Sequence, residues 1–241
     1  MITKDIKRIK QKIYQHNITA ESVRLGILLA VVGGFLDAYT YIGHGGVFAN
    51  AQSGNIVLFA INATNGRYIQ AFYSFLPIVA FILGVLVSEA IKSKLSSNSF
   101  DNWQIVVIAI EIVVLSIIGF IPRETSSSLI TVIISFVSSV QITSFKKLVD
   151  SPYSTTMCTG NLRCASEAAY RAFVKKDRQE GKKSIRYLVV ILFFVLGAIL
   201  GGIFTKSMGN KSIWITVVIL IIALLQFRID EYIFDSNKSY K

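Results

Sequence analysis

The sequence predicts an all-α polytopic membrane protein, and three features lead to this fold class. Of the 241 residues, 53% are hydrophobic and only 16% are charged, and the mean hydropathy is +0.57. Long apolar runs recur along the chain, and basic residues gather between them. This composition excludes a disordered chain and is unlike that of a soluble globular domain. The net charge of +11 therefore indicates anionic lipid as the acidic partner, and not nucleic acid.

The chain begins with a basic arm, residues 1–22. Ile2, Ile6, Ile9 and Ile13 recur at helical spacing, and most of the lysines lie away from that stripe. This pattern predicts an amphipathic helix that lies on the membrane surface. A signal peptide would end in a small-residue cleavage site, which is not evident here, so we expect the arm to be retained.

Six apolar runs are long enough to cross a bilayer of about 30 Å, and open backbone cannot face lipid, so all six are predicted to be helices. They are approximately Val23 to Ile42, Tyr68 to Ile91, Trp103 to Ile121, Leu129 to Phe145, Ile185 to Phe204 and Ile213 to Phe227. Two further segments, Val47 to Asn62 and Tyr153 to Phe173, are interrupted by small and polar residues. We interpret these two as re-entrant or broken helices inside the protein.

The placement of basic residues predicts the orientation. If the six runs cross, most Lys and Arg fall on one side of the membrane, and Arg67, Arg123, Lys206 and Lys211 fall on the other. The asymmetry is smaller if the two interrupted segments also cross. The positive-inside rule therefore favours six spans with both termini in the cytoplasm.

An internal repeat relates the two halves of the chain. Ser53-Gly54-Asn55 and Thr159-Gly160-Asn161 each follow one apolar run and precede another, and Phe81-Ile82-Leu83-Gly84 matches Phe194-Val195-Leu196-Gly197. Each half holds three spans, an odd number, so the second half enters the membrane from the opposite side. This predicts an inverted 3+3 repeat, typical of transporters and channels. The predicted parts are a first repeat at 23–121, a second at 127–229 and a cytoplasmic tail at 230–241.

Three motifs carry a resemblance to a known family. They are Gly34-Phe35-Leu36-Asp37-Ala38, the stretch from Gly45 to Asn55, and Thr159-Gly160-Asn161. With these motifs the chain resembles the YoaK-like family of bacterial membrane proteins, catalogued as domain of unknown function 1275. The family more often has Thr at the position of Ser53, which keeps the hydroxyl. The resemblance implies a multi-pass protein of the bacterial cytoplasmic membrane, grouped with candidate transporters.

Two acids lie inside predicted spans. Asp37 shares a helical face with Gly33 and Tyr41, and Glu111 lies in the middle of the third run. A charged carboxylate at the bilayer centre costs about 2.5 to 3.5 kcal/mol, so both should face the helix bundle or water. The functional interpretation is solute or cation binding for Asp37, and ion coupling for Glu111. The structural alternative is a neutral acid that hydrogen-bonds to a neighbouring helix.

The two repeated tripeptides are predicted to break helices near the solute path. Glycine permits unusual backbone angles, while hydroxyl and amide side chains satisfy the backbone groups that a break sets free. A solute site is predicted from the polar members of both tripeptides, Asp37 and Gln141, since Gln141 holds the place in the fourth run that Gly33 to Asp37 hold in the first. The predicted members are Asp37, Ser53, Asn55, Gln141, Thr159 and Asn161. The alternative for the tripeptides is that the glycines only let helices pack closely, and the alternative for Gln141 is a hydrogen bond between helices.

Arg163 and Glu167 are four residues apart in the second interrupted segment, so they could pair and either gate the path or form a structural ion pair. Gly197 and Gly201 form a GxxxG motif, echoed by Gly84 and Ser88. These small residues predict close helix packing, within one chain or in a homo-oligomer.

Enzyme classes find little support. Ala51-Gln52-Ser53-Gly54 is similar to the serine motif of intramembrane rhomboid-like proteases, but the only nearby base is His44, which we interpret as a solvated loop residue. No nucleotide-binding or zinc motif occurs, and the two cysteines and two histidines are not spaced as metal ligands. We therefore expect no enzymatic activity, cofactor or metal.

The predicted function is secondary transport of a small polar or cationic solute, by alternating access around a site at the membrane midplane. The driving ion would be H⁺ or Na⁺. The alternatives are a channel, and a scaffold or regulatory membrane protein that moves no solute.

Overall fold

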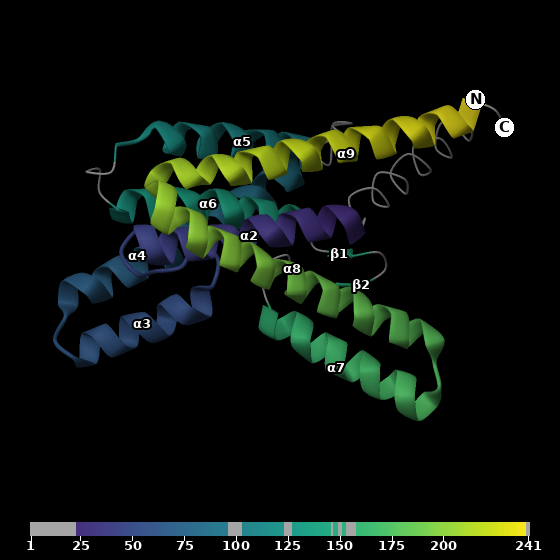
Figure 1. Ribbon diagram of the computed structural model, residues 1–241, viewed down its shortest axis with the longest axis horizontal. Helices are drawn as coiled ribbons and strands as arrows, with labels where there is room; N and C mark the ends of the chain where they lie inside the picture. Colours follow the sequence, from purple (N-terminus) through teal and green to yellow (C-terminus); the bar gives the residue numbers. More distant parts are fainter. Residues whose placement is uncertain are drawn as a thin grey trace.

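Helices make up nearly all of the described chain in the computed structural model, which describes residues 23–95, 103–122, 127–145, 147–148, 151–152 and 158–239 (Figure 1). The basic arm predicted at residues 1–22 lies outside this part. The helices are α2 Val23–Gly43, α3 Gln52–Thr64, α4 Tyr68–Leu95, α5 Trp103–Phe120, α6 Ser127–Ser144, α7 Cys158–Lys175, α8 Arg178–Met208 and α9 Ile213–Ser239. The predicted all-α class is confirmed.

Two small elements were not predicted. The antiparallel strands β1 Lys147–Leu148 and β2 Ser151–Pro152 pair between α6 and α7. A 3₁₀ turn, η1 Gly209–Ser212, joins α8 to α9. In addition, α9 continues as a helix to Ser239, so the predicted tail at 230–241 is largely an extension of the last span.

Five helical stretches in the described part of the chain are long and apolar enough to cross a membrane. They are Val23–Gly43, Tyr68–Ser93, Trp103–Phe120, Ser127–Ser144 and Arg178–Ile229. The last stretch holds both α8 and α9, which form a hairpin at η1 (Figure 1). All six predicted apolar runs therefore lie in helices.

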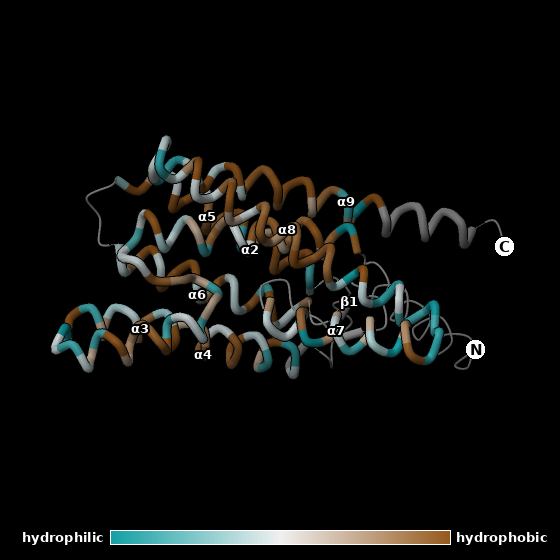
Figure 2. The backbone as a smooth tube through the Cα atoms, turned by 60° about the horizontal axis from the view of Figure 1, so that its bottom comes forward, coloured by the Kyte–Doolittle hydropathy of each residue, from teal (hydrophilic) through white to brown (hydrophobic). Residues whose placement is uncertain are grey.

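The long helices form a bundle around α2. Helix α2 packs along α8 and also contacts α6 and α9, while α4 packs along α6, and α5 packs on α6 and α9. Helices α3 and α7 stand outside this bundle, α3 on α4 and α7 on α8. Both views show α3 and α7 running toward opposite ends of the molecule (Figures 1 and 2).

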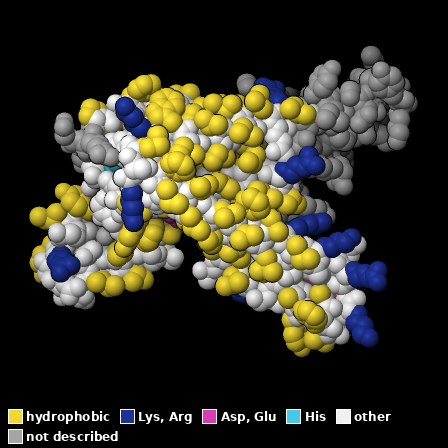
Figure 3. Space-filling model, viewed as in Figure 1, with side chains coloured by type: hydrophobic (Ala, Val, Ile, Leu, Met, Phe, Trp, Pro, Cys, Tyr) yellow, Lys and Arg dark blue, Asp and Glu magenta, His cyan; other side chains and the backbone are white. Residues whose placement is uncertain are grey.

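The buried core lies where α2 meets α5, α6 and α9. Leu29 and Phe35 on α2, Leu115 on α5, Ile134 on α6 and Leu220 on α9 are almost completely buried in one cluster. Apolar side chains also cover the outside of the bundle, where Figure 3 shows a nearly continuous hydrophobic face. A face of this extent suits contact with lipid tails.

Glycines let the main helix pairs approach closely. A Cβ on Gly197 would collide with the backbone of Val31, and one on Gly201 would lie 2.5 Å from the Phe35 carbonyl oxygen, so α8 and α2 touch at these two glycines. At the crossing of α4 and α6, a Cβ on Gly84 would meet the Phe136 carbonyl oxygen and Ser139. The small residues thus serve packing within this chain.

The two interrupted segments differ from the prediction in one respect. Each tripeptide lies in the first turn of an unbroken helix, Ser53-Gly54-Asn55 in α3 and Thr159-Gly160-Asn161 in α7. The irregular backbone described here precedes α3, in residues 44–51, and does not interrupt it. Each tripeptide therefore lies where a helix begins in the described part of the chain.

Candidate functional site

The loop from His44 to Ala51 turns back along α2 and fixes the start of α3. Gly45 and Gly46 have φ angles of +90° and +71°, a left-handed conformation that glycine adopts without strain, and they reverse the chain after His44. The returning loop is then tied to α2, because the Asn50 backbone N–H donates to Asp37 Oδ1 at 2.6 Å. The Ala49 N–H donates to Thr40 Oγ1 at 3.1 Å.

Asn55 holds the shape of this loop. Its Oδ1 accepts the Phe48 N–H at 2.8 Å, and its Nδ2 donates to the Phe48 carbonyl at 2.7 Å and to Gln52 Oε1 at 2.9 Å. Gln52 in turn donates to the Ala49 carbonyl and to Ser135 Oγ on α6. The Gly45 to Asn55 motif thus encodes a self-bonded loop anchored to α2 and α6.

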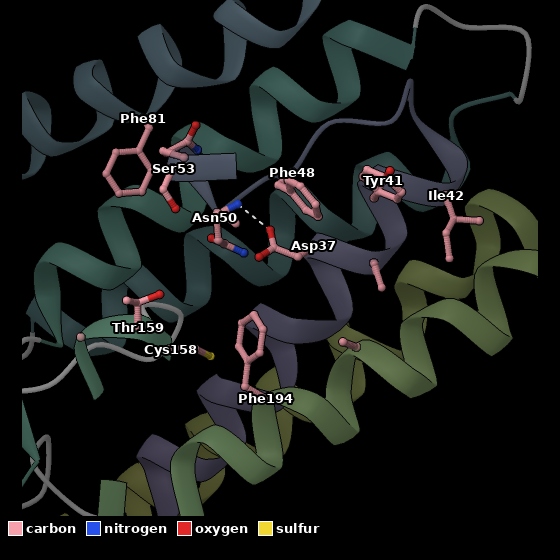
Figure 4. A pocket seen from close by; sticks show the side chains of 15 residues that line it. Asp37, Tyr41, Ile42, Phe48, Asn50, Ser53, Phe81, Cys158, Thr159 and Phe194 are labelled. Atoms are coloured by element: carbon pink, nitrogen blue, oxygen red, sulfur yellow. Dashed lines mark hydrogen bonds between the residues drawn. The ribbon is translucent and has the colours of Figure 1, made fainter. Parts of the chain in front are cut away.

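A pocket of about 570 Å³ opens where the starts of α3 and α7 meet beside α2 (Figure 4). Fifteen residues line it, from α2, the loop, α3, α4, α7 and α8. Those with polar or aromatic side chains are Asp37, Tyr41, Phe48, Asn50, Gln52, Ser53, Phe81, Cys158, Thr159 and Phe194. The pocket therefore brings together Asp37 and the hydroxyl residues of both repeated tripeptides.

The pocket has few polar groups, and not all of them have a hydrogen-bond partner within the described ranges. Asp37 is the sole Asp, Glu, Lys, Arg or His among the described residues that line it. Asn50 donates from Nδ2 to the Gly33 carbonyl at 3.2 Å, but its Oδ1 has no hydrogen-bond partner in the described part of the chain. Most of the remaining wall is apolar.

Three predicted members of the solute site do not line this pocket. Asn55 is completely buried in the loop contacts described above. Asn161 is buried in the first turn of α7 and is absent from the lining residues. Gln141 lies between helices instead, where its Nε2 donates to Glu111 Oε2 at 2.7 Å. A shared position in the repeat therefore did not place Gln141 in the site, because its side chain faces α5.

Glu111 is almost completely buried, and Gln141 is its hydrogen-bond partner from α6. Its other oxygen, Oε1, has no partner among the described residues. Glu111 does not line the pocket. The pair thus links α5 to α6 at a position separate from the loop and both tripeptides.

Arg163 and Glu167 form an ion pair on the exposed face of α7, with Nε and Oε1 3.7 Å apart. Their side chains are 77% and 52% exposed. Arg171 continues this network, at 4.0 Å from Glu167 and 2.7 Å from Glu180 on α8. Neither Arg163 nor Glu167 lines the pocket, although Thr159, one helical turn before Arg163, does.

The interpretation of His44 as a solvated loop residue is wrong. Its side chain is buried against Tyr39, with ring centroids 4.6 Å apart, and Thr131 on α6 donates to its carbonyl. The turn at Gly45 and Gly46 then reverses the chain directly after His44. No group of three or more His, Cys, Asp or Glu that could hold a metal occurs within the described ranges.

Comparison with known proteins identifies the family. A family model described as "Protein of unknown function (DUF1275)" matches residues 25–226. The chain belongs to the DUF1275 family. This DUF1275 chain is 26% identical over 199 residues to the UPF0700 transmembrane protein YoaK of Bacillus subtilis (strain 168), with 80% of the chain and 88% of the relative covered. No solved structure matches it. The resemblance seen in the sequence is confirmed, and the chain is a multi-pass membrane protein.

Some pocket residues of this DUF1275 protein were not singled out from the sequence. Asn50 and Gln52 lie inside the Gly45 to Asn55 motif. Polar residues are common in loops, so only their hydrogen bonds in the structure distinguish these two amides. Phe81 and Phe194 begin the matched tetrapeptides of the two halves, and both line the pocket. The match between the two tetrapeptides was the signal available in the sequence, because both phenylalanines begin it.

Proposed function

We propose that this protein is a secondary transporter that binds a small solute in the pocket between the starts of α3 and α7. The observation that carries the proposal is the meeting of both repeated tripeptides, from distant parts of the sequence, in one cavity beside a buried acid. Transporters with internal repeats bind their solutes where discontinuous segments of the two repeats meet.

The helix contacts support an inverted repeat. Exchange of α2, α3, α4 and α5 for α6, α7, α8 and α9 converts the α2–α8 contact into α6–α4, and the α3–α4 contact into α7–α8. The same exchange converts α2–α9 into α6–α5 and maps α5–α9 onto itself. We infer that the two halves, 23–121 and 127–229, are related by an axis that passes near the pocket.

The lengths of the surrounding helices favour a pocket at the membrane midplane. Phe81 lies in the middle of α4, and Phe194 lies in the middle of α8. From this level α3 and α7 run outward in opposite directions, each for at least half a bilayer at about 1.5 Å per residue. Alternating access would then expose the pocket along α3 on one side and along α7 on the other.

The charged face of α7 supports an aqueous path on its side. Arg163 lies about 6 Å along the helix from Thr159 at the pocket, a depth at which a charged side chain avoids lipid. We propose that Arg163 and Glu167 line the path that joins the pocket to the cytoplasm. Figure 3 shows the molecule hollowed between the α3–α4 arm and the α7–α8 arm.

The basic turn between α7 and α8 favours a cytoplasmic location for that end. Lys175, Lys176, Arg178, Lys182 and Lys183 cluster there, and Figure 3 shows dark blue side chains gathered at this corner. We propose that this cluster contacts anionic lipid of the bacterial cytoplasmic membrane, with both chain termini on the same side.

Uptake into proteoliposomes tests the transport proposal. Purified protein would be reconstituted with an imposed H⁺ or Na⁺ gradient and offered a panel of small amines, amino acids and sugars, read out by mass spectrometry. We expect gradient-driven uptake that Asp37→Asn abolishes and that Glu89→Gln, a half-exposed acid near the end of α4, leaves intact. Uptake without a gradient dependence would indicate a channel, and no uptake of any solute would favour a scaffold.

A further inference from the structure

The pocket has a carboxyl group and an unused acceptor, but no described cationic side chain. Asp37 accepts the Asn50 backbone N–H at Oδ1, and Asn50 Oδ1 accepts nothing in the described part of the chain. The Asn50 amide nitrogen donates to Gly33, and that of Gln52 donates to Ala49 and Ser135. A ligand that complements these groups brings positive charge or hydrogen-bond donors.

Aromatic rings surround the acid. Phe48 comes from the loop, Phe81 from α4 and Phe194 from α8, so three separate segments supply them. In Figure 4 the Asp37 carboxylate lies between the rings of Phe48 and Phe194, with Phe81 farther along the pocket. The faces of aromatic rings attract cations, and this attraction is strongest where water is excluded.

The size and polarity of the pocket exclude other classes of ligand. A volume of about 570 Å³ is that of a site for an organic molecule and far exceeds what a bare Na⁺ occupies. An anion would be repelled by Asp37. A sugar needs hydrogen-bonding groups around its whole ring, whereas most of this wall is apolar. Its polar side chains among the described residues are Asp37, Asn50, Gln52, Cys158 and the hydroxyls of Tyr41, Ser53 and Thr159.

We propose that the pocket binds a hydrophobic organic cation, with its ammonium group at Asp37 and Asn50 Oδ1 and its apolar body among Phe48, Phe81 and Phe194. This inference rests on the proposed function for the site, and it names the chemical class of the solute. A cationic solute also explains why, among the described residues, only one half of the chain contributes an acid to the pocket. The two tripeptides and the two phenylalanines are repeated in both halves, whereas the acid is present in the first half alone.

Equilibrium binding tests the inference without a gradient. Wild-type protein in lipid nanodiscs would be titrated calorimetrically with benzyltrimethylammonium, benzyl alcohol and benzylsulfonate, which share one ring and differ in charge, with empty nanodiscs as the blank. We expect the cation to bind at least about tenfold more tightly than the other two probes. Equal affinities, tighter binding of the neutral or anionic probe, or no binding of the cation would overturn the inference.

Three variants locate the binding. Asp37→Asn keeps an acceptor for the Asn50 N–H and should weaken cation binding about ten- to a hundredfold, while Glu89→Gln should leave it unchanged. Phe81→Leu, on a different helix, should weaken it about threefold with the acid intact, so a misfolded Asp37 variant does not decide the result. Cation binding that is unaffected by both pocket variants would contradict the site.

The binding inference and the transport proposal can be refuted independently of each other. Cation binding that depends on Asp37, in a protein that moves no solute in proteoliposomes, would sustain this inference and overturn the proposed transport. Uptake of an anion or a neutral solute that survives Asp37→Asn would sustain the proposed transport and overturn this inference.

Discussion

Two acids are buried among the described side chains of the membrane helices, and their surroundings differ. Asp37 is 5% exposed and Glu111 is 1% exposed, so burial does not separate them. Asp37 accepts a backbone N–H from an irregular loop and lines a pocket. Glu111 accepts a side-chain N–H from the next helix, between regular α5 and α6. Irregular backbone and a cavity therefore distinguish the surroundings of Asp37 from those of Glu111.

Substitution of Asp37 should have the largest effect on activity. Asp37→Asn removes the charge that we assign to solute binding, and should lower uptake of benzyltrimethylammonium into proteoliposomes about a hundredfold. Glu111→Gln keeps an acceptor for Gln141 and should leave uptake within about twofold of the wild type. If Glu111→Gln also loses gradient-driven uptake, Glu111 is the coupling acid that the sequence suggested, and the contrast between the two acids fails.

Loss of the hydrogen bonds that hold the loop should weaken cation binding at Asp37, although Asp37 itself is unchanged. Asn55→Ala removes the hydrogen bonds that hold Phe48 and Gln52, so Asn50 and the Phe48 ring lose their fixed positions. We expect cation affinity to fall about tenfold in calorimetric titration, and the unfolding free energy to fall by about 2 to 3 kcal/mol. Asn62→Ala, at the far end of α3, is the matched control. Unchanged affinity would show that the loop does not shape the site.

Removal of the partner of Glu111 should affect stability alone. Gln141→Leu leaves a buried carboxylate without its donor, at a cost of about 1 to 3 kcal/mol of unfolding free energy, measured by denaturant titration in detergent. Cation binding should stay at the wild-type value. Weaker binding with unchanged stability would instead place Gln141 near the solute, as predicted from the repeat.

The smallest change is expected when both members of that pair are replaced. Glu111→Leu combined with Gln141→Leu removes the buried polar groups together, so the unfolding free energy should return to within about 1 kcal/mol of the wild type. Uptake should also persist. A double variant that is stable but inactive would assign a functional role to the α5–α6 contact.

The sequence predicts the membrane class and several residues that line the pocket. Apolar length identifies the long helices, and the repeated tripeptides identify the two helix starts that meet at the pocket. Hydropathy cannot tell whether a polar segment interrupts a helix or precedes one, so α3 and α7 were expected to be broken. Hydropathy also does not give the direction of a buried side chain. For this reason Gln141 was predicted to line the site, and the hydrogen bonds by which Asn55 holds the loop were not predicted.

We expect the pocket to be accessible to water and to prefer cations. Chemical modification of Cys158 is the most direct test of both properties. The chain has two cysteines, and Cys158 lines the pocket. In a Cys164→Ser background, Cys158 would be modified with the cationic trimethylammonium-ethyl methanethiosulfonate or the anionic sulfonatoethyl reagent, each rate divided by that for a free thiol. We predict faster modification by the cation, protection by benzyltrimethylammonium, and loss of the preference in Asp37→Asn. Equal normalised rates in both proteins, or no modification at all, would contradict the account.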